Sequence, residues 1–525
     1  MVLFNTSQSL TDEQKAVVEA PENILTVTAY AGTGKTSTLK AFAQARAKES
    51  MLYLAFNRSM AEEARASFSS QTNVEVRTIH SLAFQQCGRP YKNKLGSLRA
   101  IDIIPFIQSL NIPRQNLYLV AKVILEAYYD WLISSQSTPL AFFKSYKPRL
   151  TAIANLNKLK IGEIIKAVEA LWQASIDGSL PMPHNGYLKL FQLSDKRCLK
   201  YFDRILIDEA QDLNDCMIDV VVNNQSKKVL VGDPYQQIYA FNGAVNAIKK
   251  TVENGAARYY LTKSFRCPAK VATIANQYLK LLEAPKPFSS AVTDANSRKR
   301  VSNPPSMLII ARTNAGIFDF VATNNNILGK VYYFGGFDSY DFGTILDIVK
   351  LGIGEIDTIK DSLVKRFKNM DELEEYSGGV NDVATNTRIK IAKRYNRRVF
   401  TIYKEMVKNV GRNTYDSNLL VSTAHKIKGQ EHVEVALLDD FASVKTIVET
   451  ALAIQKSKGN NESNFSPPPF RLSLEELRLL YVSITRSKHK LEIPPKYHLD
   501  DELIKKFTFL KQQGFVDVRD EAGTL

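Results

Sequence analysis

A stretch near the start of the chain joins an apolar strand to two glycines, a lysine and a threonine. The segment Ile24–Ala29 is rich in β-branched residues, and Gly32, Gly34, Lys35 and Thr36 follow it. Glycines between a strand and a helix allow backbone N–H groups to close on phosphate oxygens. The lysine of such a phosphate-binding loop (P-loop) reaches the β- and γ-phosphates, and the threonine hydroxyl ligates Mg²⁺. The strand ends in alanine where the usual pattern begins with glycine, but the order of strand, loop and helix still predicts a site for ATP and Mg²⁺.

Two adjacent carboxylates follow a second apolar segment, which ends at Ile207. Asp208 can hold Mg²⁺ through water, and Glu209 can take a proton from an attacking water. Neighbouring strand residues point to opposite faces, so paired acids at this place are costly without a cation. An acidic turn is the alternative, and the P-loop upstream makes it the weaker interpretation.

A third strand ends in Gly-Asp and leads into an amide pair and two aromatic residues. Gln236 could sense the γ-phosphate or position water, and Tyr239 and Phe241 could offer faces on which bases stack. Base stacking on an aromatic ring contributes ~1–3 kcal/mol per base. The alternative is that both rings belong to the core. That alternative is a serious one for Tyr239 and weaker for Phe241, which stands beside Asn242 and Gly243.

The elements that position these residues alternate between strands and helices, which predicts an α/β doubly wound sheet. Ligands of such sheets bind at the carboxyl ends of the strands. Thr11 is expected to cap a helix in which Gln14 could bond adenine through its amide. Segment 74–82 is expected to be a strand that ends in small polar residues, where His80 could equally be a capped turn histidine. The residues expected at strand ends are Phe56, Asn57, Arg58, Thr78 and His80.

The composition narrows the class of protein. A chain of 525 residues is too long for one core, so a few domains are expected. Sixty-nine basic against 54 acidic residues give a net charge of +15, which favours polyanionic partners. No apolar run is long enough to span a membrane. The N-terminal residues lack the pattern of a secretory signal. The four cysteines are scattered and indicate neither disulfides nor a zinc site. We therefore expect no membrane partner and a cytoplasmic protein, associated with the nucleoid in a bacterium or phage and nuclear in a eukaryote.

Read together, the motifs resemble those of superfamily 1 helicases of the UvrD/Rep type. Within that family the chain is most similar to the helicase part of F-box DNA helicases, although no F-box is expected before Gln14. The segments that carry the resemblance are Gln14, the P-loop, 54–58, 78–80, 207–212, 232–244, 260–266, 421–431 and 475–486.

The resemblance implies two RecA-like P-loop NTPase motor domains, each with an inserted, mainly helical subdomain. The first motor domain is expected at 1–90 and 185–262, with a helical insertion at 91–184. The second is expected at 263–340 and 416–525, with a small helical insertion at 341–415.

The resemblance also assigns roles to residues. Arg266 and Arg486 are expected to be arginine fingers, because a planar guanidinium meets two γ-phosphate oxygens. Arg486 also lies near the end of a helix that starts with a capping-box pattern at Ser473, where a cation would stabilise the helix dipole. Catalytic roles fall to Glu209, Gln236, Arg266 and Arg486; ATP binding to Gln14, Gly32, Thr33, Gly34, Lys35, Thr36, Phe265 and Glu431; Mg²⁺ binding to Thr36 and Asp208; and DNA binding to Phe56, Asn57, Arg58, Thr78, His80, Tyr239, Phe241, Thr423 and His425.

The function that the resemblance implies is an ATP-dependent DNA helicase or translocase. It would travel 3′→5′ on single-stranded DNA, act at single-strand/duplex junctions and serve DNA repair, recombination or replication. The small second insertion leaves open an ATP-driven remodeller that strips recombinase filaments from DNA without unwinding duplexes.

Overall fold

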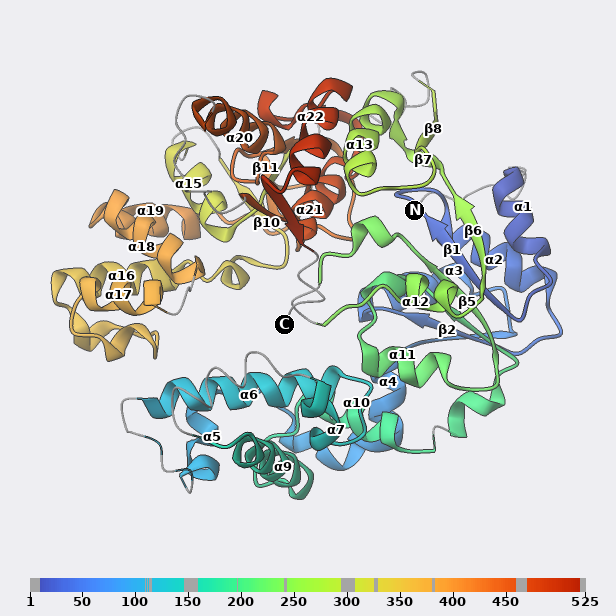
Figure 1. Ribbon diagram of the computed structural model, residues 1–525, viewed down its shortest axis with the longest axis horizontal. Helices are drawn as coiled ribbons and strands as arrows, with labels where there is room; N and C mark the ends of the chain where they lie inside the picture. The colour runs from blue at the N-terminus through green and yellow to red at the C-terminus, as the bar shows by residue number, and fades with distance from the viewer. Residues whose placement is uncertain are drawn as a thin grey trace. The chain divides into compact units, whose positions relative to one another are not determined.

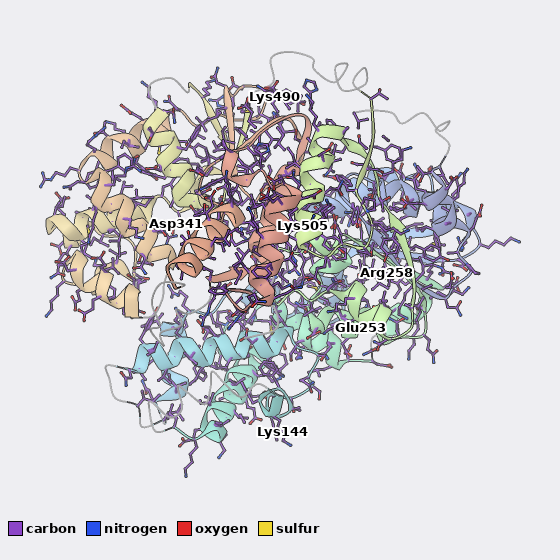
Figure 2. All side chains as sticks on the ribbon, turned by 45° about the horizontal axis from the view of Figure 1, so that its top comes forward. Lys144, Glu253, Arg258, Asp341, Lys490 and Lys505 are labelled. Carbon is purple, nitrogen blue, oxygen red and sulfur yellow. The ribbon has the colours of Figure 1, made fainter. Side chains whose placement is uncertain are left out.

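The computed structural model describes residues 10–108, 110, 112, 116–145, 159–195, 197–239, 243–293, 307–324, 329–379, 383–458 and 470–519. The chain divides into two compact units, one taking in the chain up to Thr262 and the other running from Lys263 to Arg519 (Figure 1). Charged side chains are exposed on both units, as Glu253 and Arg258 on the first and Lys505 on the second illustrate (Figure 2). No helix of the described residues is long and apolar enough to cross a membrane.

The first unit is built on a parallel sheet with the strand order β3-β2-β4-β5-β1-β6. The inner strands are buried almost throughout, which explains their nearly continuous apolar sequences. All carboxyl ends lie at one edge, where parallel α/β sheets bind ligands. The strands are β1 (Ile24–Ala29), β2 (Met51–Ala55), β3 (Val74–Thr78), β4 (Arg204–Ile207), β5 (Lys227–Gly232) and β6 (Ala257–Leu261).

Helices cover both faces of this sheet and bury two apolar cores. Those of one face are α1 (Asp12–Glu19), α2 (Lys35–Ala45) and α3 (Arg58–Ser67). Those of the other are α4 (Ile79–Ala83), α10 (His184–Leu193), α11 (Asp215–Val222) and α12 (Ala247–Glu253). The single strand predicted at 74–82 is therefore too long: Thr78 ends β3 and caps α4, because its hydroxyl accepts the N–H of Ser81 at 3.1 Å.

A separate group of helices in the same unit has its own core around Trp131, which meets Trp172 edge-on at 5.2 Å. Its members are α5 (Ala100–Ile107), α6 (Leu117–Ile133), α7 (Pro139–Ser145) and α9 (Ile161–Asp177).

The second unit contains a parallel sheet with the order β10-β11-β9-β12-β14 and two parallel strand pairs, β7–β8 and β13–β15. The sheet strands are β9 (Met307–Ala311), β10 (Val331–Tyr333), β11 (Leu419–Thr423), β12 (His432–Leu437) and β14 (Ser487–Glu492). The paired strands are β7 (Lys263–Pro268), β8 (Ser289–Val292), β13 (Phe470–Ser473) and β15 (Val516–Arg519).

The helices of the second unit fall into two groups. The first consists of α13 (Ala269–Leu281), α15 (Asn314–Asn324), α20 (Val444–Lys458), α21 (Leu474–Ile484) and α22 (Asp501–Gln512). The second consists of α16 (Gly343–Ile353), α17 (Met370–Gly379), α18 (Val383–Tyr395) and α19 (Arg398–Lys408), which share one apolar core with α15, β9, β10 and β11. The prediction of an α/β protein with parallel sheets is thus confirmed, while the predicted domain boundaries stay predictions.

Candidate active site

The predicted phosphate-binding loop connects β1 to α2. Gly32 and Gly34 have φ angles of 68° and 82°, in the left-handed region that glycine adopts without strain. Gly34 is the N-cap of α2, so Lys35 and Thr36 occupy the first turn of that helix. The Thr33 hydroxyl donates to a carbonyl three residues earlier at 2.9 Å and fixes the loop. The first N–H groups of a helix lack partners within it, which suits this loop to bind phosphate.

Gln14 is buried between α1 and the loop. Its Oε1 accepts a hydrogen bond from the backbone N of Thr11 at 3.0 Å, and its Nε2 donates to the carbonyl of Thr33 at 3.3 Å. Both ends of the amide therefore tie α1 to the loop. A bond to adenine would have to replace one of them, and that role of Gln14 stays a prediction.

Asp208 and Glu209 lie directly beyond β4, next to the P-loop lysine. The Nζ of Lys35 is 2.9 Å from Oε1 of Glu209, and both side chains are largely shielded from solvent. Asp208 accepts two hydrogen bonds, at Oδ1 from the backbone N of Glu209 (2.9 Å) and at Oδ2 from the hydroxyl of Tyr53 (2.5 Å). Glu209 has a φ of 52°, a conformation that is uncommon for a residue with a side chain and that clusters at functional sites.

The electrostatics of this group favour a cation. Burial alone would lower the pKa of the Lys35 ammonium, but the neighbouring carboxylates, with Glu209 the strongest, outweigh it and raise that pKa. Burial, followed by the charge of Glu209, raises the pKa of Asp208. Three carboxylates, those of Asp208, Glu209 and Asp233, therefore act on one ammonium group.

The same group offers the oxygen ligands that Mg²⁺ prefers, the Thr36 hydroxyl and the Asp208 carboxylate. Within the described ranges no cluster of three or more His, Cys, Asp or Glu side chains could hold a metal ion by itself. A site with so few protein ligands suits Mg²⁺, which usually binds one or two carboxylates together with substrate phosphates and water.

A buried amide connects the acid pair to the next strand. Gln211 donates through Nε2 to Oε2 of Glu209 at 2.6 Å and accepts at Oε1 from the backbone N of Asp233 at 3.0 Å. Asp233 in turn accepts from Nε2 of Gln236 at 2.6 Å. Gly232 allows this close approach, because a Cβ there would overlap Oε1 of Gln211. The predicted general base and Gln236 therefore belong to one hydrogen-bonded network.

Two aromatic rings at the ends of different strands lie face to face. Phe56 follows β2, and its ring is 5.7 Å from that of Tyr239 with an interplanar angle of 11°. Both side chains are partly exposed, so the pair is not enclosed in the core. Offset or parallel rings of this kind give a base a surface on which to stack. Phe241, the other aromatic residue predicted here, lies outside the described residues.

His80 lies in α4 rather than in a strand or a turn. Its Nε2 is 3.4 Å from Oδ1 of Asn185, and its ring meets that of Tyr187 edge-on at 6.0 Å. Burial lowers the pKa of this imidazole, so it is neutral at pH 7. A neutral histidine can contact nucleic acid through hydrogen bonds or stacking, but it adds no charge that would attract phosphate.

The other predicted DNA contacts of the first unit have local roles. Asn57 and Thr78 are the N-caps of α3 and α4, and a side-chain oxygen of each accepts a helix N–H. Arg58 is exposed and pairs with Glu62 at 2.9 Å. These contacts explain the residue types without DNA, so their nucleic-acid roles stay predictions.

In the second unit, the carboxylate of Glu431 lies among cationic side chains, two of which are the predicted arginine fingers. Its carboxylate forms ion pairs with Arg266 of β7 and, at 2.5 Å, with Lys488 of β14. Burial would raise the pKa of Glu431, but these cations outweigh it, with Arg266 first, and lower that pKa. Arg486 adds to the same effect. Residues from three distant segments thus form one charged cluster within this unit.

Arg486 is fully buried at the end of α21. Its guanidinium donates to the carbonyl of Val482 at 2.8 Å, to the carbonyl of Gln430 at 3.1 Å and to the hydroxyl of Thr485 at 3.2 Å. The bond to Val482 is the helix-end interaction that the sequence left open as an alternative. The bond to Gln430 holds the arginine beside the segment of Glu431, so the two interpretations are compatible.

The N-terminus of helix α21 differs from the capping box predicted at Ser473. Ser473 is the N-cap of α21, and its hydroxyl accepts a hydrogen bond from the backbone N of Glu475 at 3.1 Å. The second bond of a capping box, from the backbone N of Ser473 to the side chain of Glu476, is replaced. The Glu476 carboxylate pairs instead with Nε of Arg312 at 2.7 Å. The capping-box prediction is therefore wrong in its second half, because a partner distant in sequence offers the carboxylate a charged donor.

The remaining predicted residues of the second unit differ in exposure. Phe265 is 38% exposed on β7. Thr423 is buried at the end of β11. His425 lies 3.2 Å through Nε2 from Oε1 of Glu475. Neither of the last two has a role that the structure tests.

Four residues that join the predicted ones were not singled out from the sequence: Tyr53, Gln211, Asp233 and Lys488. Gln211 and Asp233 stand within the motifs of Glu209 and Gln236, and this closeness in sequence is the only feature that marks them as members of the site. Tyr53 and Lys488 are far in sequence from their partners, and nothing in their own segments marks them.

Comparisons with known proteins agree with the motifs. Residues 10–256 match the family described as UvrD/REP helicase N-terminal domain. F-box DNA helicase 1 of Gallus gallus is 28% identical over 512 residues, which cover 91% of this chain and 48% of the relative. F-box DNA helicase protein 1 of Schizosaccharomyces pombe is 27% identical over 92% of this chain and 57% of the relative. DNA helicase II of Escherichia coli is 26% identical over 52% of this chain and 40% of its own length.

The chain thus spans about half the length of the curated relatives it matches. The resemblance predicted from the motifs is confirmed by these matches, which bear on both units because the F-box relatives align with nine-tenths of the chain.

Proposed function

Because residues 10–256 match the family described as UvrD/REP helicase N-terminal domain, we propose that the protein is an ATP-dependent DNA helicase or translocase that moves on single-stranded DNA. The observation that carries this proposal is the meeting of Lys35 with Glu209 at 2.9 Å at the carboxyl ends of β1 and β4. A lysine beside a P-loop and a carboxylate at the position of a general base are the groups that phosphoryl transfer to water requires.

We propose that the phosphates of ATP compete with Glu209 for Lys35. A triphosphate bound by the N–H groups of the loop would draw the ammonium toward its β- and γ-oxygens. Glu209 would then be free to accept a proton from the attacking water, while its bond from Gln211 keeps the carboxylate in place. Mg²⁺, held by Thr36 and Asp208, would neutralise charge that develops on the phosphates.

The cluster of the second unit supports a role for its arginines in the same reaction. Arg266 and Arg486 would supply positive charge to the γ-phosphate, and Glu431 would bond the ribose. Phe265, with its exposed ring, would stack on adenine. These four assignments rest on the resemblance to UvrD/Rep helicases and on the convergence of Arg266, Arg486 and Glu431 within the unit.

The stacked rings of Phe56 and Tyr239 support a path for DNA on the first unit. Tyr239 follows Gln236 by three residues, so one short segment joins the ATP site to the proposed base-stacking surface. His80, Asn57, Arg58 and Thr78 would extend this surface, with Phe241, Thr423 and His425 as further contacts. Travel in the 3′→5′ direction, action at single-strand/duplex junctions and a place in repair, recombination or replication are proposed from the family.

The protein would act wherever DNA is processed, at the nucleoid or in the nucleus. Stripping of recombinase filaments was suggested only by the size of the second insertion, and no contact among the described residues favours it.

DNA-stimulated ATPase activity tests the proposal. Lys35→Ala is expected to lower kcat on the order of 10²-fold or more, because a charged phosphate contact is lost, and Glu209→Gln to lower it about 10²–10⁴-fold through loss of the base. Lys506→Ala and Glu502→Gln, which open an exposed ion pair of 2.5 Å, are matched controls with unchanged kcat.

Full activity in Lys35→Ala or Glu209→Gln would reject the proposed site. Unwinding of duplexes with 3′ or 5′ single-stranded tails tests direction, and preference for the 5′ tail would reject 3′→5′ travel.

A further inference from the structure

The hydroxyl of Tyr53 is enclosed beneath the candidate ATP site. Tyr53 lies in the middle of β2 and is 1% exposed. Its ring packs against that of Phe68 at 5.0 Å between centroids, which fixes the direction of the phenol group. The aromatic ring is thus part of the core, while the hydroxyl reaches the carboxyl edge of the sheet.

This hydroxyl touches two functional side chains at once. It donates a hydrogen bond of 2.5 Å to Oδ2 of Asp208, which is 155 residues away in sequence. The side chain of Thr36 interacts with the same phenol group. Asp208 and Thr36 are the two residues expected to hold Mg²⁺.

We propose that Tyr53 is a positioning residue of the Mg²⁺–nucleotide site, whose hydroxyl holds the Asp208 carboxylate so that its remaining lone pairs face the cation. The proposal rests on the proposed function, because it requires that the site binds ATP with Mg²⁺.

The hydrogen bonds that Asp208 accepts are the reason. A carboxylate offers about four lone pairs, and those of Asp208 that face Tyr53 and the backbone N of Glu209 are used. The remaining lone pairs are thereby given a fixed direction.

The phenol group carries one proton, and it donates that proton to Asp208. Groups that orient metal ligands in this way typically change metal affinity or activity by about 10–100-fold when they are removed.

A purely structural role makes a different prediction. A buried phenol needs a partner, and a hydroxyl such as that of Tyr128, which bonds to Ser175 at 2.9 Å in the helical group, serves packing alone. Removal of such a hydroxyl should lower stability without changing the response to Mg²⁺. The two roles can therefore be separated by a measurement of Mg²⁺ dependence.

The test is the binding of a fluorescent ATP analogue to the full chain, titrated with Mg²⁺ and repeated in EDTA. We expect Tyr53→Phe to raise the half-saturating Mg²⁺ concentration about 10–100-fold and to leave nucleotide affinity in EDTA unchanged. Tyr128→Phe is the matched control and should bind like the wild type under both conditions. In an Asp208→Asn background, Tyr53→Phe should add no further shift, because the residue acts through Asp208.

An unchanged Mg²⁺ midpoint in Tyr53→Phe, or an equal loss of affinity with and without Mg²⁺, would overturn the assignment. If Tyr53→Phe does not fold, 4-fluorophenylalanine at this position fills the space of the hydroxyl without donating a proton, and an unshifted midpoint would overturn the assignment equally. A wild-type chain that binds no nucleotide in either condition would instead refute the proposed function, so the two failures are distinguishable.

Discussion

Replacement of Gly232 by alanine tests how closely β5 and the segment of Glu209 must approach. The backbone of Gly232 is not in the left-handed region, so alanine meets no conformational penalty there. An added Cβ would overlap Oε1 of Gln211 and lie 3.0 Å from the backbone N of Ala210. Gln211 could rotate away, but the backbone contact requires the segment after Asp208 to shift by a few tenths of an ångström.

Two effects set the expected decrease in the free energy of unfolding. Extra volume in a packed core lowers the free energy of unfolding by roughly 1–3 kcal/mol. Displacement of Gln211 also breaks its bonds to Glu209 and to the backbone N of Asp233, each contributing about 1 kcal/mol. The sum of about 3–5 kcal/mol corresponds to a fall in Tm of roughly 6–20 °C for a unit of this size. Misplacement of the base should also lower kcat by about 10–100-fold.

Calorimetry of the full chain and DNA-stimulated ATPase activity measure these effects. The matched control is Gly162→Ala on α9, where an added Cβ has no heavy atom within 4 Å. Because alanine is the better helix former, Gly162→Ala should raise the free energy of unfolding by up to about 1 kcal/mol and leave kcat unchanged. The reasoning would be refuted if Gly232→Ala kept both the Tm and the kcat of the wild type.

Two further predictions concern residues outside the catalytic network. Glu49 pairs with Arg204 and Lys227 at 2.8 and 2.9 Å. A hydrogen bond from Arg204 is the main cause that lowers the pKa of Glu49 to about 2. Because this folded pKa lies below the unfolded one, the carboxylate stabilises the fold by about 1–3 kcal/mol above pH 4.5, and this contribution is lost toward pH 2. Urea unfolding should therefore show the wild type more stable than Glu49→Gln at pH 7, with the difference narrowing between pH 5 and 3, and a constant difference would contradict this. Phe265→Ala should raise the KM for ATP several-fold and change stability by less than about 0.5 kcal/mol, because the ring is 38% exposed. Phe509→Ala, at 48% exposure, should change neither, and an equal KM in both variants would exclude stacking by Phe265.

Local signals in the sequence predicted the elements that carry the site. The β-branched run and glycines around Gly32 and Gly34 led to the observed strand, loop and helix. Thr11 was predicted as an N-cap, and its hydroxyl accepts a helix N–H in the structure. Such features depend on a few adjacent residues, so one sequence suffices to predict them. The exception is the segment after Val74, where the cap at Thr78 ended the strand earlier than its composition indicated.

The sequence by itself therefore determined the α/β class, the phosphate loop and the acid pair, because each is written in consecutive residues. Only the tertiary structure decided that Lys35 meets Glu209 and that the hydroxyl of Tyr53 holds Asp208. These contacts join residues up to 174 positions apart, and their distances depend on the order of strands in the sheet. No local pattern encodes that order, since it follows from how β2, β4, β5 and β1 pack in sequence across the sheet once both faces are covered.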